Sequence, residues 1–168
     1  VFHPHGWIRA EQIVELIQHA QHKHGKKVKF LTFKEALDPT FKAYQQQVRK
    51  KARAMAEVFI KRGYKVVSGG TDNHLVLIHV TSFGLTGRQA EAALLEAGIV
   101  TNRNAVPADP NGAWYTSGVR IGTPALTTRG FGADEFDKVA ELIVNVLKNT
   151  TAAIASSGRP GKAKYVLA

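Results

Sequence analysis

The sequence has 168 residues, of which 44% are hydrophobic and 21% are charged, as expected for one globular domain with appendages. Its 23 lysines and arginines outnumber its 13 acidic residues, and a net charge of +10 favours nucleic acid, anionic membranes or phosphorylated small molecules as partners. The absence of cysteine excludes disulfides, Cys-ligated metal sites and thiol catalysis. No apolar run approaches the ~18 residues that cross a bilayer, and residues 1–5 do not resemble a signal peptide. We therefore expect a cytoplasmic chain without a membrane partner.

Helical periodicity dominates the first third of the chain. Apolar residues fall on one face over residues 11–20, which predicts a short helix, and residues 27–33 form a strand or a linking segment. Asp38 and Pro39 then provide an N-cap and a first-turn proline for a long helix that ends at Gly63. The buried face of that helix is predicted to contain Phe41, Tyr44, Val48, Ala52, Met55 and Phe59.

Short strands and helices alternate in the rest of the chain. Residues 64–67 and 75–80 are predicted to pair as antiparallel strands across the turn at 68–73. Thr86 and Gln89 match a capping box and begin a helix that closes before Gly98. Residues 118–122 form a further predicted strand, and a last helix starts near residue 134, whereas residues beyond 149 lack periodicity.

This order of elements predicts an α+β fold with α/β layers. A small, mostly antiparallel sheet is covered on one face by helices. We divide the chain into a strand and helix segment of uncertain origin at residues 1–35, a globular domain at 36–149 and a flexible tail at 150–168.

Four phrases identify a family resemblance. The sequence reads GYKVVSGGTDNHL at 63–75, LTGR at 85–88, NRNAVP at 102–107 and TSGVRIGTPA at 116–125. In this order and spacing they resemble the C-terminal small domain of serine hydroxymethyltransferase, from about residue 33 to residue 149 and into the tail. The resemblance implies the small-domain fold of fold-type I pyridoxal-phosphate enzymes. In the parent family, serine and glycine are interconverted with tetrahydrofolate by means of pyridoxal phosphate.

The resemblance implies two substrate-binding residues. Arg120 matches the arginine that binds the amino-acid carboxylate, a task suited to a planar guanidinium with two parallel N–H donors. Asn104 matches an asparagine near the folate ligand. From spacing alone, Arg120 is equally compatible with a strand-edge arginine paired to an internal acid, and Asn104 with a turn asparagine.

No catalytic or cofactor-binding residue is expected in this chain. The family's large domain carries the Schiff-base lysine and the aspartate that pairs with the pyridine nitrogen, and no Thr-His-Lys-like motif occurs here. We therefore expect the isolated chain to be inactive and to hold no cofactor, with pyridoxal phosphate confined to the parent enzyme.

The alternative hypothesis is a noncatalytic scaffold or interaction domain, natural or engineered. Residues 1–35 are faintly similar to the end of a polysaccharide deacetylase, which suggests a chimera. The basic run at residues 49–53 could contact anions or nucleic-acid phosphates, but little aromatic interleaving accompanies it, so we do not expect a nucleic-acid partner. An apolar face left by a missing large domain would favour a homo-oligomer.

Histidines at metal-binding spacings also occur near the N-terminus. His3 and His5 alternate along an extended segment, and His19, His22 and His24 cluster on or near a helix. These spacings suit zinc, nickel or copper, but no fixed acid partner accompanies them. We expect no native metal.

Overall fold

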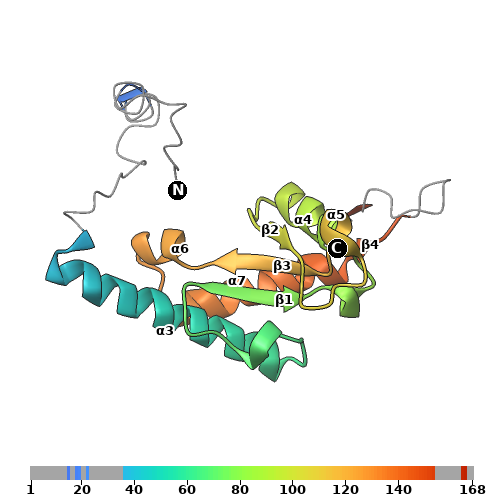
Figure 1. Ribbon diagram of the computed structural model, residues 1–168, viewed down its shortest axis with the longest axis horizontal. Coiled ribbons are helices and arrows are strands. Elements are labelled where there is room, and N and C mark those ends of the chain that lie inside the picture. The colour runs from blue at the N-terminus through green and yellow to red at the C-terminus, as the bar shows by residue number, and fades with distance from the viewer. Residues whose placement is uncertain (1–14, 16–17, 20–21, 23–35, 154–163, 166–168) are drawn as a thin grey trace. The chain divides into compact units, whose positions relative to one another are not determined.

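The computed structural model describes residues 36–153 together with residues 15, 18, 19, 22, 164 and 165 (Figure 1). The chain divides into two compact units, residues 1–43 and 44–168, each considered by itself. In the first unit, residues 15, 18, 19 and 22 are helical, within or next to the predicted helix. The predicted strand at 27–33 lies outside the described residues, as do His3, His5 and His24.

The long helix begins where the sequence predicts. The Asp38 carboxylate accepts hydrogen bonds from the Thr40 backbone N (2.8 Å) and hydroxyl (2.6 Å), and helix α3 runs from Pro39 to Lys61. These bonds stabilise the charged carboxylate and hold the pKa of Asp38 below its ordinary value, with the side-chain bond contributing most. The turn that follows contains Gly63 at φ +82°, a left-handed conformation typical of residues that end helices.

The second unit contains the sheet and most of the helices. Its further elements are η2 (Val67–Gly69), β1 (Leu75–His79), η3 (Thr81–Phe83), α4 (Gly87–Glu96), β2 (Asn102–Asn104), α5 (Gly112–Tyr115), β3 (Gly118–Gly122), α6 (Pro124–Thr128), α7 (Ala133–Lys148), β4 (Thr150–Thr151) and β5 (Lys164–Tyr165).

The main sheet has the strand order β1-β3-β2, and both pairs are antiparallel. Buried residues of β1 and β3 join one hydrophobic cluster with buried residues of the three longer helices. The largest fully buried side chains are Phe59 and Met55 of α3, Ile78 of β1, Leu94 of α4, and Phe136, Ile143 and Leu147 of α7. The predicted α+β layering, with an antiparallel sheet covered by helices, is confirmed.

The strand predictions are partly wrong. Residues 118–122 form β3 as predicted, but residues 64–67 contribute only an isolated bridge between Val66 and Ile78. The backbone turns left-handed at Ser68 (φ 63°) and Gly69 (φ 69°), so that segment leaves the sheet after one pair. The second neighbour of β3 is β2, which lies in a segment that we did not predict as a strand.

Beyond residue 149, where the sequence lacks periodicity, β4 and β5 pair antiparallel. The pairing joins Thr150 to Tyr165 and Thr151 to Lys164. The side-chain amide of Gln89 on α4 donates to the Ala153 carbonyl at 3.1 Å, so α4 contacts the chain just after β4. None of the helices in the described residues is long and apolar enough to cross a membrane.

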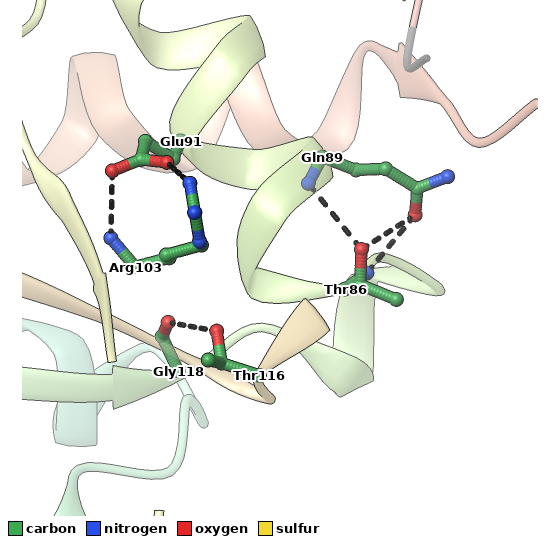
Figure 2. A network of polar contacts seen from close by, with 6 residues as sticks. All are labelled: Thr86, Gln89, Glu91, Arg103, Thr116 and Gly118. Carbon is green, nitrogen blue, oxygen red and sulfur yellow. Dashed lines mark hydrogen bonds and ion pairs between the residues drawn. The ribbon is translucent and has the colours of Figure 1, made fainter. Parts of the chain in front are cut away.

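Helix α4 is fixed to the sheet through its first turn. The predicted capping box is confirmed: Thr86 Oγ1 accepts from the Gln89 backbone N, and Gln89 Oε1 accepts from the Thr86 backbone N (Figure 2). Gly87 N donates to the Thr116 carbonyl at 2.8 Å. A Cβ at Gly87 would meet the Thr116 side chain and would lie 2.6 Å from the Gly118 carbonyl oxygen. Only glycine therefore allows this close approach of α4 to the start of β3.

Gly87→Ala is expected to lower the free energy of unfolding by about 1–3 kcal/mol, because the added methyl group overpacks against backbone that cannot move alone. Gly122→Ala is the matched control, since its Cβ would meet atoms no nearer than 3.6 Å. We expect the control to stay within about 0.5 kcal/mol of the unmodified chain in urea unfolding. Equal effects of the two variants would contradict the close approach.

Candidate functional site

The face of the sheet opposite the core presents a short array of polar groups. Side chains alternate between the two faces of a strand, and the core face carries Val76, Ile78, Val119 and Ile121. The opposite face, called here the open face, carries the other residues of each strand. These are Leu75, Leu77 and His79 of β1, Asn102 and Asn104 of β2, and Gly118, Arg120 and Gly122 of β3.

Arg120 occupies the middle of the open face and is exposed. In the register it lies between Leu77 of β1 and Asn102 of β2, and glycines occupy the next open-face positions of its own strand. Among the described residues, no carboxylate lies within ion-pair distance of its guanidinium. The sequence analysis kept an internal acid as an alternative partner of Arg120. Such an acid is therefore not found in the described part of the chain.

Asn104 lies on the same face. Asn104 of β2 pairs with Gly118 of β3, so it is a diagonal neighbour of Arg120 on the adjacent strand. Long side chains can bridge the distance between diagonal neighbours. Its Nδ2 donates to the Ala105 carbonyl at 2.7 Å, which orients the amide of this half-buried side chain. The two residues that the family resemblance indicated are thus placed on one face by the β2–β3 register.

The loop from residue 105 to residue 117 connects the strands that carry these two residues. Asp109, which the sequence analysis missed, lies within this loop. The carboxylate of Asp109 accepts four hydrogen bonds. The donors are Val106 N (3.0 Å), Asn111 N (2.9 Å), Ser117 N (2.7 Å) and Ser117 Oγ (2.6 Å). The signal in the sequence was the run Asp-Pro-Asn-Gly at 109–112, whose first residue is a frequent acceptor in turns.

These hydrogen bonds determine the charge of Asp109. Its partial burial by itself raises the pKa, but the Ser117 hydroxyl and the three backbone donors favour the charged form and together hold the pKa below its ordinary value. The group is therefore a carboxylate throughout the neutral pH range. Ser117 is almost fully buried and also accepts from Asn111 Nδ2 at 2.9 Å, so the loop has a closed polar interior.

His79 is the one titratable group of the open face apart from Arg120. Burial lowers its pKa, the positive charge of Lys65 lowers it further, and Asp109 acts in the opposite direction. Because the net shift is downward from an ordinary value near 6.5, His79 is predominantly neutral at pH 7.

Arg103 faces the helical side of β2 instead of the open face. Its backbone N donates to Glu91 Oε1 at 3.1 Å and its guanidinium pairs with Glu91 Oε2 (Figure 2). The guanidinium carbons of Arg103 and Arg88 lie 5.7 and 4.9 Å from the ring centre of Trp114, which is 61% exposed. Two neighbouring residues of the same motif thus lie in different environments. Arg103 forms an ion pair with Glu91, and Asn104 lies on the open face.

The residues of the open face do not by themselves suit pyridoxal phosphate. The cofactor needs an amine for an imine bond and an acid beside the pyridine nitrogen, and the open face carries neither lysine nor carboxylate. Within the described residues, no group of three or more His, Asp or Glu side chains could hold a metal ion. The amine and the acid that pyridoxal phosphate needs are therefore not found among the open-face residues.

The basic run of α3 is exposed over most of its length, in keeping with a solvated helix surface. One of its cations is engaged within the fold, because Arg49 Nε donates to the Asp72 carbonyl at 2.6 Å. That bond joins α3 to the turn that precedes β1.

Ser117→Ala is expected to lower the free energy of unfolding at pH 7 by about 1–3 kcal/mol, since it removes a buried donor to a carboxylate. The pKa of Asp109 is lower in the folded chain than in the unfolded chain. The stabilisation that the ionised carboxylate gives the fold is therefore present above the unfolded pKa, and it is lost as the pH falls through the folded pKa. The difference between the two proteins should therefore narrow below about pH 4.

Urea unfolding over a pH series measures this difference, with the exposed Ser82→Ala as the control. A difference that stays constant down to about pH 2 would argue against the hydrogen bond to an ionised Asp109.

Comparison with known proteins gives a consistent result. A family model described as serine hydroxymethyltransferase matches residues 10–143. The chain is 64% identical over 146 residues to serine hydroxymethyltransferase of Cutibacterium acnes, covering 86% of this chain and 30% of that protein. It is 64% identical over 145 residues to the enzyme of Mycolicibacterium smegmatis, covering 86% and 29%. The enzyme of Treponema pallidum is 49% identical over 139 residues, covering 83% and 24%.

Two facts follow from these alignments. The chain spans about 30% of the length of the curated relatives that it matches. The family match also begins at residue 10, whereas the motifs alone placed the start near residue 33. Residues 10–32 therefore match the same family as the rest, and the suggestion of a chimera stays an untested prediction.

Proposed function

The chain belongs to the serine hydroxymethyltransferase family, and on this premise we propose that it acts as the C-terminal small domain of such an enzyme. The observation that carries the proposal is the placement of Arg120 and Asn104 on one open face of the sheet. In this role the domain binds and orients substrates, and the reacting groups come from sequence that the chain does not contain. The length of the relatives supports this division, since they are about three times as long as this chain.

Arg120 is proposed to bind the carboxylate of serine or glycine. Its guanidinium is exposed, is flanked along its strand by glycines, and is not engaged by an acid of the described residues. Two parallel N–H···O bonds to a carboxylate would fix both the position and the plane of the amino acid, which a lysine at this position could not do.

Asn104 is proposed to contact the folate. Its Nδ2 donates to the Ala105 carbonyl, and the described residues provide no hydrogen bond to its Oδ1, which leaves that oxygen to accept from a ligand. A carbonyl oxygen of this kind accepts from the N–H groups of a heterocycle such as the pterin of tetrahydrofolate.

The isolated chain is proposed to be inactive. Pyridoxal phosphate, when bound in the parent enzymes, supplies the electron sink for the reaction. In the described residues up to 153, every lysine is exposed or half-exposed on a helix or loop, and none occupies the open face. The described residues therefore place no lysine amine on the face that carries Arg120.

A spectroscopic experiment tests this inactivity. The purified chain is titrated with pyridoxal phosphate, reduced with borohydride and mapped by peptide mass spectrometry. We expect scattered, unsaturable modification of exposed lysines and no cleavage of serine with tetrahydrofolate. A saturable adduct at one lysine, with serine cleavage that Arg120→Ala abolishes, would overturn the proposal of an inactive domain.

A fusion tests the binding role. The full chain is joined after the part of the Cutibacterium acnes relative that it does not match, and serine cleavage is followed with pyridoxal phosphate and tetrahydrofolate. We expect activity, and we expect Arg120→Lys to raise the KM for serine by about 10- to 100-fold, the loss of a charged bidentate pair. Arg53→Lys, on the exposed side of α3, is the matched control and should leave the KM unchanged.

A folded fusion without activity, or an Arg120→Lys variant with an unchanged KM for serine, would contradict the proposed function. Such a result would favour the alternative of a noncatalytic domain with a basic surface. Retained activity would leave that alternative without support.

A further inference from the structure

The antiparallel pairing of β2 and β3 stops just before the loop that joins them. The last pair is Asn104 with Gly118, and no further pair of the two strands follows it. Ala108 (φ 53°) and Thr116 (φ 56°) take left-handed conformations that strands do not contain. Backbone ladder bonds therefore cannot continue between the segment that leaves β2 and the segment that enters β3.

The Asp109 carboxylate takes the place of those ladder bonds. Its Oδ2 accepts from Val106 N (3.0 Å) on the outgoing segment and from Ser117 N (2.7 Å) on the incoming one. Its Oδ1 accepts from Asn111 N (2.9 Å) and from Ser117 Oγ (2.6 Å). One oxygen thus joins the two segments, and the other fixes the loop around it.

The positions of these donors relate the loop to the open face. Val106 follows Asn104 by two residues and Ser117 precedes Arg120 by three. The Ser117 carbonyl also accepts from Val80 N at 2.9 Å, which anchors the same residue to the end of the segment that leaves β1. Since a shift of one residue in the β2–β3 register moves the side chains of β2 to the other face, loss of this junction would allow Asn104 to leave the face that carries Arg120, and it would release the entry of β3 at Ser117.

We propose that Asp109 is a positioning residue that holds Asn104 and Arg120 on one face through the β2–β3 junction. The proposal rests on the proposed function for the ligands of those two residues. Asp109 lies in the loop and acts on the ligands only through the strands. Its effect is expected on the binding of both substrates together, because it orients one group for each.

The chemistry requires a carboxylate at this position. An asparagine has one acceptor oxygen, so in either orientation its NH₂ group would face two of the present donors. If the amide oxygen stays on Asn111 and the Ser117 hydroxyl, the amide nitrogen faces Val106 N and Ser117 N. The two segments would then lose the bridge between them, while the size of the side chain is unchanged.

The test compares Asp109→Asn with Asp72→Asn, which removes the same charge from an exposed side chain in the turn before β1. In the fusion with the Cutibacterium acnes part, we expect Asp109→Asn to raise the KM for serine and the KM for tetrahydrofolate each by about 10-fold, the loss of one charge-assisted contact. Asp72→Asn should change neither. Arg120→Lys should change the KM for serine alone, which separates positioning from direct contact.

Failure of the two proposals gives different results. An unchanged KM for serine in Arg120→Lys contradicts the proposed function. A normal pair of KM values in Asp109→Asn, or a fall in kcat with both KM values unchanged, overturns the positioning role while leaving the function standing.

A measurement on the unmodified chain covers the case in which Asp109→Asn does not fold. Amide hydrogen exchange of Val106 and Ser117 should be slowed at least about 10-fold relative to exposed loop amides, as expected for amides held in stable hydrogen bonds. Exchange of these two amides at unprotected rates would overturn the proposal without any variant.

Asp109→Glu, which keeps the charge and both acceptor oxygens, should restore part of the tetrahydrofolate affinity lost in Asp109→Asn.

Discussion

The central position of β3 is the constraint on which the other features depend. Because β3 pairs with β1 on one side and β2 on the other, its alternation assigns side chains to two environments at once. Val119 and Ile121 enter the core with α3, α4 and α7, while Arg120 between them faces the opposite way. Burial of two apolar residues therefore fixes the direction of a cation, and the hydrophobic core positions the candidate site.

The approach of α4 to β3 carries the same constraint to the helical layer. Gly87 brings the first turn of α4 against Thr116 and Gly118, and the Thr86–Gln89 box satisfies the helix terminus there (Figure 2). Glu91, one turn later, reaches the backbone and side chain of Arg103 on β2. Helix α4 thus contacts the two strands that bear Asn104 and Arg120, and it does so from the side opposite to the open face.

The sequence predicts those features that depend on local periodicity or on a local motif. The N-cap of α3, the capping box of α4 and the five residues of β3 follow from patterns within a few residues of each other. The strand predicted at 64–67 fails because left-handed residues at 68 and 69 end the pairing, which hydrophobicity does not reveal. β2 is only three residues long and polar, so no hydrophobic alternation in the sequence indicates its pairing with β3.

The same distinction applies to the site. Family resemblance indicated Arg120 and Asn104, but their placement on one face depends on a register between segments 14 residues apart at their closest pair, Asn104 and Gly118. Asp109 was missed for a related reason: an aspartate before a proline looks like any turn residue, and its four donors are spread over the loop from Val106 to Ser117. A side chain that joins two strands through a loop has no periodic signature, because its partners are set by loop closure. Such residues are found only when the donors are counted in the folded chain, where the Asp109 carboxylate accepts four hydrogen bonds and joins the segments that follow β2 and precede β3.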